Sequence, residues 1–324
     1  ELSLTGYIMD RPDFTLNATF NIGRNKNKID KLASGEKEMV LSSGWAGSQL
    51  LNSDDYRAYV GGTTGLIYGF VNDGFYTVDD FKPFDSKSRK WTLKDGVVNS
   101  SPLSGDPRPG NAKFKKLTPV DENSANPYTL TDDDRTVIGN TTPKFSGGFG
   151  LNATFKGFDV SAFFNFMYDF DVFNANKVMM TTWASNNYNN FSMDISAAKR
   201  WRNFDDMGNE IRYSPEILAE FNKNATMWNP TSIGRPIAMS YAVEDGSFLR
   251  LNTATIGYTL PRAWTNKVGL SRVRFYASGY NLFTITGYSG YDPEVDIATG
   301  LTPNIDNNRY PRSRTYTFGV QLTF

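Results

Sequence analysis

The stretch TYTFGVQLTF, residues 315–324, shows the alternation that decides the fold. Successive side chains of a β-strand point to opposite faces of a sheet, so this pattern predicts a strand with one apolar and one polar face. In a soluble sheet these would be the core and solvent faces, and in a transmembrane barrel the lipid and lumen faces. The aromatic residue at the last position favours the barrel. The apolar set is Tyr316, Phe318, Val320, Leu322 and Phe324.

The same period of two recurs in six other segments and predicts seven strands in all. Lys156 and Gly157 form a two-residue hairpin turn between two of them. The apolar residues Leu249 and Leu251 have the opposite parity to those that follow, so we expect a bulge there, or a start outside the membrane. The six segments are residues 2–9, 14–22, 145–155, 158–170, 248–260 and 273–283.

Short and long connections alternate between these strands. Loops this long are unusual in a compact domain, whereas outer-membrane barrels have short periplasmic turns and long extracellular loops. If Phe324 lies at the periplasmic rim, every short connection falls on the periplasmic side. The short connections are 10–13, 156–157 and 261–272, and the long ones are 25–144, 171–247 and 284–313.

The long connections contain further local patterns. We expect short helices at 195–203 and 214–223, the second with Pro215 in its first turn. The glycine- and aromatic-rich segment 60–78 predicts tight hairpins above the membrane, although it could instead contain a pair of short transmembrane strands.

The composition excludes several classes of function. The 324 residues carry 34 basic and 34 acidic side chains, so no basic excess points to nucleic acid. Cysteine and histidine are both missing from the sequence, which removes disulfides, thiolate metal sites and a Ser-His-Asp triad. Aromatic residues make up 15% of a chain whose mean hydropathy is −0.45, a combination that transmembrane barrels show. No run approaches 18 apolar residues, so no transmembrane helix is predicted.

Several stretches, in this order, resemble the C-terminal barrel of the SusC/RagA-type TonB-dependent outer-membrane transporters. Each is moderately specific by itself, and their ordered combination covers most of the chain. They are DDRTVIGN (133–140), PKFSGG (143–148), VEDGSFLRL (243–251), IGYTLP (256–261), RVRFYASGYNLF (272–283), GYSGYDPE (287–294) and RYPRSRTYTFG (309–319).

The resemblance implies an antiparallel transmembrane barrel of about 22 strands with a plugged lumen. It also implies TonB-driven import of oligosaccharides, or sometimes peptides, across the outer membrane of a gram-negative bacterium. A SusD-like surface lipoprotein would cap the barrel, and no cofactor is implied. Seven strands cannot close a barrel, so we expect residues 1–324 to be its C-terminal part, with the plug and TonB box outside this chain.

Aromatic side chains in the long connections are the candidates for contact with ligand or lid. Their faces can stack on sugar rings, but they could equally serve loop packing or the aromatic girdle. The candidates are Trp183, Tyr188, Trp201, Trp228, Tyr288 and Tyr291, together with Asp292.

Charged residues in the same connections have simpler interpretations. We expect Arg309, Arg312 and Arg314 to pair with carboxylates. The acidic loop at 121–134 departs from a calcium-binding loop at Ala125 and Asn126, so no metal site is predicted.

Two other classes of protein remain as alternatives. One is a soluble all-β glycan-binding module or a carboxylate-based glycosidase, and the other is a structural or adhesive surface barrel. Pairs such as Asp205-Asp206 could in principle support glycosidase chemistry, but adjacent loop carboxylates are usually hydrated, so we predict no catalytic site. Against the soluble class, one face of residues 158–170 is almost entirely aromatic or aliphatic.

Overall fold

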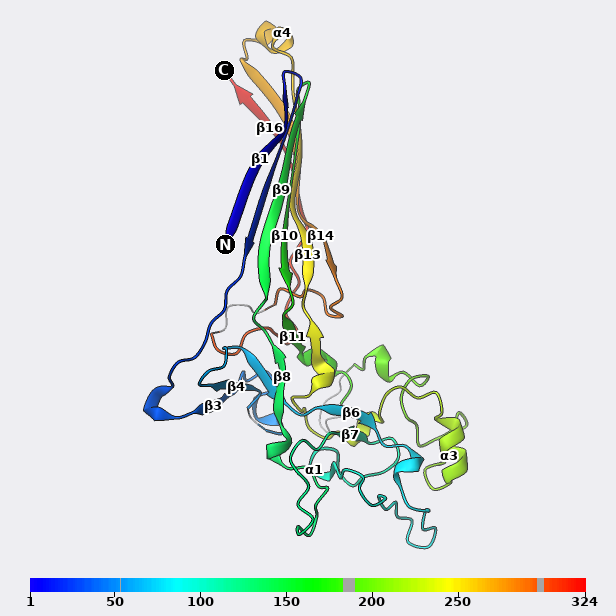
Figure 1. The fold of residues 1–324 in the computed structure, drawn as a ribbon. Helices are drawn as coiled ribbons and strands as arrows, with labels where there is room; N and C mark the ends of the chain where they lie inside the picture. The colour runs from blue at the N-terminus through cyan, green and yellow to red at the C-terminus, as the bar shows by residue number, and fades with distance from the viewer. Residues whose placement is uncertain (53, 183–189, 296–299) are drawn as a thin grey trace.

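The computed structural model describes residues 1–324 apart from 53, 183–189, 296–299 and the side chain of Ser34. Figure 1 shows a tall sheet of long strands, with tight connections at one end and a broad body of loops at the other. Among the described residues, no helix is both long enough and apolar enough to cross a bilayer.

The tall sheet has seven antiparallel strands in the order β1-β2-β9-β10-β13-β14-β16, which confirms the seven predicted strands. β10 ends at Tyr168, two residues earlier than expected, because Asp169 adopts a positive φ of 59° and breaks the alternation. The strands are β1 (Leu2–Arg11), β2 (Phe14–Gly23), β9 (Phe145–Phe155), β10 (Phe158–Tyr168), β13 (Phe248–Thr259), β14 (Arg272–Thr286) and β16 (Thr315–Thr323).

The strand register joins the apolar residues into a continuous band. Directly opposed residues of neighbouring strands share a face, so each row across the sheet has one chemical character. One row is apolar and the adjacent row is polar, and this alternation continues along the strands. The apolar row runs Leu16, Ala153, Val160, Ile256, Ala277, Phe318, and the polar row runs Asn17, Asn152, Ser161, Thr255, Ser278, Thr317.

Hydrogen bonds connect neighbouring side chains on the polar face. The amide of Asn152 donates to Asn17 at 3.0 Å, and the hydroxyls of Thr255 and Ser278 lie 2.8 Å apart. On the other face Phe318 is 80% exposed within this chain. A sheet with one hydrogen-bonded polar face and one exposed apolar face fits a wall between water and lipid.

The tight connections all lie at one end of the sheet (Figure 1). Lys156 and Gly157 have φ values of 45° and 90°, the two positive values that a type I′ hairpin requires. Arg262–Thr265 (α4) lies in the connection between β13 and β14. The expected bulge is also present, because the register of β13 shifts between Leu251 and Thr253.

The long connections fold together into one body with its own core. Its largest cluster of buried side chains includes Tyr56, Phe114, Phe173, Trp228 and Met239. Three small sheets run β3-β4-β5-β8, β12-β11-β15 and β6-β7. Their strands are β3 (Glu38–Leu41), β4 (Tyr56–Tyr59), β5 (Leu66–Gly69), β6 (Asn72–Phe75), β7 (Ala112–Phe114), β8 (Thr136–Asn140), β11 (Asp171–Asn174), β12 (Val243–Asp245) and β15 (Ile305–Asp306).

Short helices complete this body. The 3₁₀ turns are η1 (Ala33–Gly35), η2 (Gly47–Gln49), η3 (Val78–Asp80), η4 (Asp132–Asp134), η5 (Met193–Ile195), η6 (Pro230–Ser232) and η7 (Ser240–Ala242), with η8 (Asn266–Val268) beside α4. The α-helices of the body are α1 (Ser101–Ser104), α2 (Ala175–Met179) and α3 (Pro215–Phe221).

The structure separates correct from incorrect predictions in the loop body. The helix expected at 214–223 is α3, with Pro215 in its first turn. The helix expected at 195–203 is wrong, because Trp201 donates its backbone N–H to the carbonyl of Met227 at 2.8 Å and extends the chain. The described strands within 60–78 belong to small sheets of the loop body, and the described part of 25–144 adds no strand to the tall sheet.

Asp134 anchors one segment of the loop body. Its buried carboxylate accepts hydrogen bonds from the backbone N–H groups of Leu117, Thr118 and Thr131 at 2.8–2.9 Å. Lys116 adds an ammonium at 3.3 Å. Burial alone would raise the pKa of Asp134, but the hydrogen bonds outweigh it and lower the pKa to about 2.

Arginine placed on either face of β10 distinguishes lipid from water. Ala162 lies in an apolar row near the middle of the band, and its neighbour Ser161 lies in a polar row. We expect Ala162→Arg to cost about 2–4 kcal/mol and to reduce heat-resistant protein in the outer membrane. The matched variant Ser161→Arg should be tolerated. Equal yields of the two variants in outer-membrane fractions would contradict the lipid assignment.

The depressed pKa of Asp134 predicts an acid dependence. A folded-state pKa below the ordinary 3.8 contributes stability that is complete above 3.8 and lost as pH falls toward about 2. Asp134→Asn should cost about 2 kcal/mol at neutral pH and remove this dependence. Denaturant unfolding followed by tryptophan fluorescence measures both effects. An unchanged acid slope in the variant would show that another group titrates.

Candidate functional site

A buried charge network joins the tall sheet to the loop body. Arg250 of β13 is only 1% exposed, and its guanidinium lies 2.5 Å from the carboxylate of Asp292. The same guanidinium is 3.4 Å from Glu294, whose carboxylate also binds Arg312 at 2.8 Å. The expectation that Arg312 pairs with a carboxylate is therefore confirmed.

This network brings together three stretches that lie apart in the sequence. Arg250 comes from SFLRL, Asp292 and Glu294 from GYDPE, and Arg312 from RYPRSR. A buried charge without a partner is very unfavourable, so the network holds the connection between β14 and β16 against the end of β13. The loop residues on either side of it are positioned by the same contacts.

A cleft of about 680 Å³ lies beside this connection. Four segments form it: α2 with the residue before it, the start of η5 at Ser192 and Asp194, the turn after β14, and the segment that leads into β16. Its lining combines amide, hydroxyl and aromatic groups with three charged side chains, Lys177, Arg309 and Asp194. The lining also includes Asn174, Asn176, Ser289, Tyr291 and Tyr310.

Glu244 fixes the polar side of the cleft. Its carboxylate accepts from the backbone N–H and the hydroxyl of Ser289 at 2.9 and 2.8 Å, and from the Asn174 amide at 3.1 Å. Lys177 lies 3.4 Å from the same carboxylate. Burial alone would raise the pKa of Glu244, but the bonds from Ser289 and the charge of Lys177 bring it below its ordinary value. The carboxylate is therefore ionised at neutral pH and compensates Lys177.

Aromatic rings pack against the side chain of Lys177. Its ammonium lies 4.5 Å from the centre of the Tyr241 ring, and the Trp228 ring packs edge-on against Tyr241 at 4.8 Å. Tyr288 donates its hydroxyl to Asp306 at 2.7 Å. Burial, and then the nearby Asp306 carboxylate, raises the pKa of Tyr288, so its hydroxyl remains a donor.

Two tyrosine rings are exposed to solvent at the cleft. Tyr291 is 85% exposed and Tyr310 is 91% exposed. The rings lie on the two segments held by the Arg250 network, beside the amides of Asn174 and Asn176. Exposed aromatic faces next to fixed amides suit a sugar ring or a peptide, because they offer stacking surface and hydrogen-bonding groups together.

The structure places the sequence candidates in different environments. Trp201, Trp228, Tyr288 and Asp292 are buried, as the alternative of loop packing expects, whereas Tyr291 is exposed at the cleft. Trp183 and Tyr188 lie outside the described residues.

Sequence analysis missed Tyr310 and Lys177 as site residues. Tyr310 stands inside the quoted motif RYPRSR, and a hydrophobic side chain between two arginines before a proline was the signal that could have marked it as exposed. Lys177 had no such signal, because its environment is made by Glu244 and Tyr241, distant in sequence.

The acidic residues considered for catalysis are engaged locally. Asp205 is half-buried and accepts from the N–H groups of Met207 and Asn209 in its own turn, and Asp206 pairs with Arg202 at 2.6 Å. Among the described residues, no three acidic side chains gather where they could hold a metal ion.

Comparison with known proteins tests the family resemblance. No family model matches the chain. A TonB-dependent receptor of Formosa agariphila is 30% identical over 330 residues, which cover the whole chain and 28% of that receptor. TonB-dependent receptor SusC of Bacteroides thetaiotaomicron is 32% identical over 164 residues, which cover 46% of the chain and 15% of SusC. The chain thus spans less than a third of the length of these relatives.

Solved structures give the same fold. The RagAB peptide importer in its closed-closed state superposes with a TM-score of 0.65 at 22% identity, over 99% of this chain and 29% of that chain. The resemblance to SusC/RagA-type TonB-dependent transporters is confirmed. The tall sheet has the fold of one arc of such a barrel, and the described strands do not close a barrel by themselves.

Breaking the Arg250 network should release the connection between β14 and β16 from the tall sheet. Arg250→Met leaves the buried carboxylate of Asp292 without its guanidinium and leaves Glu294 paired with Arg312 alone, at a cost of about 3–5 kcal/mol. We expect residues 287–312 to be cleaved faster by added protease, while the strands stay resistant. Arg314→Met, at an exposed arginine of the same segment, is the matched control. Equal protection of the two variants would show that the network does not hold the loop.

Proposed function

We propose that the chain forms the barrel wall and extracellular loop body of an outer-membrane nutrient importer in a gram-negative bacterium. The observation that carries this proposal is the sheet with an apolar band on one face and polar rows on the other. Its tight connections lie at one end and its loop body at the other, as in outer-membrane barrels. Similarity to TonB-dependent receptors along the whole chain supports it.

On this proposal, energy comes from TonB through a plug and TonB box carried by other parts of the protein. A SusD-like surface lipoprotein covers the loop body from outside. Residues 1–324 supply the C-terminal part of the barrel, and lipid surrounds the apolar band. The tight turns at 12–13 and 156–157 then lie in the periplasm.

The cargo is an oligosaccharide or a peptide that touches the cleft through Tyr291 and Tyr310. The support is chemical: two exposed rings flank amide groups, and Lys177 is already compensated by Glu244. A neutral sugar fits this surface, and so does a peptide backbone. RagAB, whose fold is similar, is a peptide importer. Trp228, Tyr288 and Asp292 act as positioning residues beneath the cleft.

Growth of a deletion strain tests the function. We expect the strain to lose growth on one class among a panel of glycans and peptides, and to regain it with the intact gene. Unchanged growth on every member of the panel, with the protein normally present in the outer membrane, would favour a structural or adhesive barrel.

Substitution of the two exposed rings tests the site. Tyr291→Ala with Tyr310→Ala should weaken cargo binding about ten-fold, because each aromatic contact contributes about 0.5–1.5 kcal/mol. Phe204→Ala is the matched control, since it removes an exposed ring of the loop body outside the cleft. Binding of the identified cargo to the purified receptor measures both. Equal affinities would remove these tyrosines from the cargo site.

A further inference from the structure

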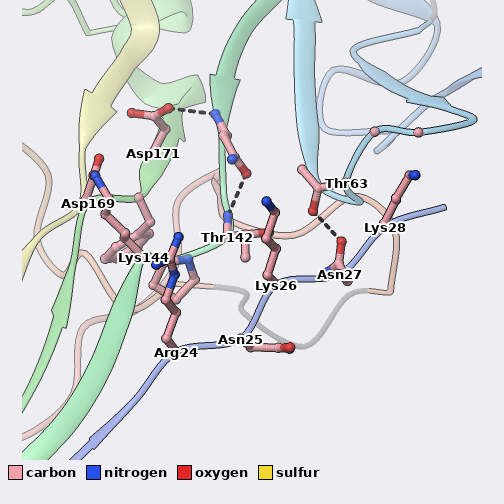
Figure 2. Close-up of a pocket in the computed structure, with 15 residues that line it drawn as sticks. Arg24, Asn25, Lys26, Asn27, Lys28, Thr63, Thr142, Lys144, Asp169 and Asp171 are labelled. Atoms are coloured by element: carbon pink, nitrogen blue, oxygen red, sulfur yellow. Dashed lines mark hydrogen bonds and ion pairs between the residues drawn. The ribbon is translucent and has the colours of Figure 1, made fainter.

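A second pocket lies where the tall sheet meets the loop body. It has a volume of about 590 Å³ and is bordered by the ends of β2 and β10, the start of β9 and the turn at 61–63. Figure 2 shows Arg24, Lys26 and Lys144 gathered along one side of it, with Lys28 further along the same segment.

The charges in this pocket are unbalanced. Lys144 is paired with Asp169 at 2.9 Å. Asp171, the other carboxylate, accepts the N–H of Asn140 at 2.6 Å, and burial raises its pKa. Four cations against two carboxylates leave a formal charge of +2. Within the described part of the chain, Arg24, Lys26 and Lys28 have no carboxylate within ion-pair distance.

The segment that carries these three cations is held in place. Ile29 donates its N–H to the carbonyl of Gly62 and accepts from the N–H of Gly61, both at 2.8 Å. The Asn27 side chain binds the backbone N–H of Thr64 at 3.2 Å and the hydroxyl of that residue at 3.1 Å.

Arg24, Lys26 and Lys28 all line the pocket. Asn25 and Asn27 line it between them, and Asn27 is the residue whose side chain binds Thr64. The backbone contacts therefore present a row of cations to the pocket.

The pocket lies directly beyond the apolar band. The guanidinium of Arg24 lies 5.8 Å from the centre of the Phe145 ring, and Phe145 pairs with Tyr168 in the last apolar row of β9 and β10. Aromatic residues commonly mark the level of lipid headgroups in membrane proteins. If the band faces lipid, the cations stand at the headgroup level of the outer leaflet.

We propose that this pocket binds the phosphate group of an outer-leaflet lipid headgroup. Guanidinium and ammonium groups both bind phosphate oxygens with charge-assisted hydrogen bonds, and Arg24, Lys26 and Lys28 are exposed for that purpose. The proposal rests on the membrane placement of the proposed function. A free phosphate ester offers the same chemistry, so the test must separate the two sources.

The experiment uses the intact receptor purified in a neutral maltoside detergent. Binding is measured to detergent micelles doped with phosphatidylglycerol, and separately to soluble glycerol 3-phosphate. For the variant Lys26→Gln with Lys28→Gln we expect lipid affinity to fall on the order of five-fold for each cation removed. Soluble glycerol phosphate should bind much more weakly, because it lacks the acyl chains that hold the lipid against the apolar band.

Lys31→Gln with Lys37→Gln is the matched control, because both lysines are exposed on the same connection but outside the pocket. Equal lipid affinity of the two double variants would overturn the proposal. Soluble glycerol phosphate that binds as tightly as the lipid would overturn the lipid as its source.

Outer-membrane location and cargo uptake are measured in the same strains. If Lys26→Gln with Lys28→Gln leaves lipid binding unchanged while location and uptake are normal, the lipid-binding role of the pocket is overturned and the proposed function stands. A wild-type receptor absent from the outer membrane would overturn the proposed function.

Discussion

The backbone of a strand in contact with lipid must find all its hydrogen-bond partners in neighbouring strands, because the bilayer core offers none. That requirement fixes antiparallel pairing along the whole length of each strand, and pairing in turn fixes which residues share a row. The alternation of apolar and polar residues then has to agree across seven strands at once. It does so from Met9 in β1 through Leu16 in β2 to Phe318 in β16, and the bulge in β13 between Leu251 and Thr253 keeps the apolar parity in phase beyond it.

The loop body depends on this sheet through a small number of buried charges. Arg250 is close to the end of the polar face, and its partners Asp292 and Glu294 come from a connection that returns to the sheet only at β16. Because a buried ion pair is expensive to separate, such a network favours one arrangement of the loops over many others. The stretches SFLRL, GYDPE and RYPRSR, which lie far apart in the sequence and share the resemblance to SusC/RagA-type transporters, meet in this network.

Local patterns allowed the sheet to be predicted from the sequence, whereas the loop body could not be. Period two, the Lys156-Gly157 turn and the parity change at Leu251 are all visible within a few residues. The environments of Trp201, Trp228 and Tyr288 are not, because they depend on contacts across the loop body, such as the Trp201 bond to Met227. The same contact is incompatible with the helix expected at 195–203. Lys177 could not be predicted as a cleft residue, because its partner Glu244 is distant in sequence.

The cleft and the pocket at the sheet boundary differ in a way that favours different ligands. In the cleft, the charge of Lys177 is compensated by Glu244 and its ammonium lies against Tyr241, while the exposed rings of Tyr291 and Tyr310 lie beside amide groups. In the pocket at the sheet boundary, Lys26 and Lys28 stand exposed beside Arg24, and Lys144 is the cation that has a partner. Attraction between exposed charges is screened within about 10 Å at moderate salt, whereas stacking on an aromatic ring is not. Salt should therefore weaken anion binding at the pocket and leave contact with neutral cargo at the cleft almost unchanged.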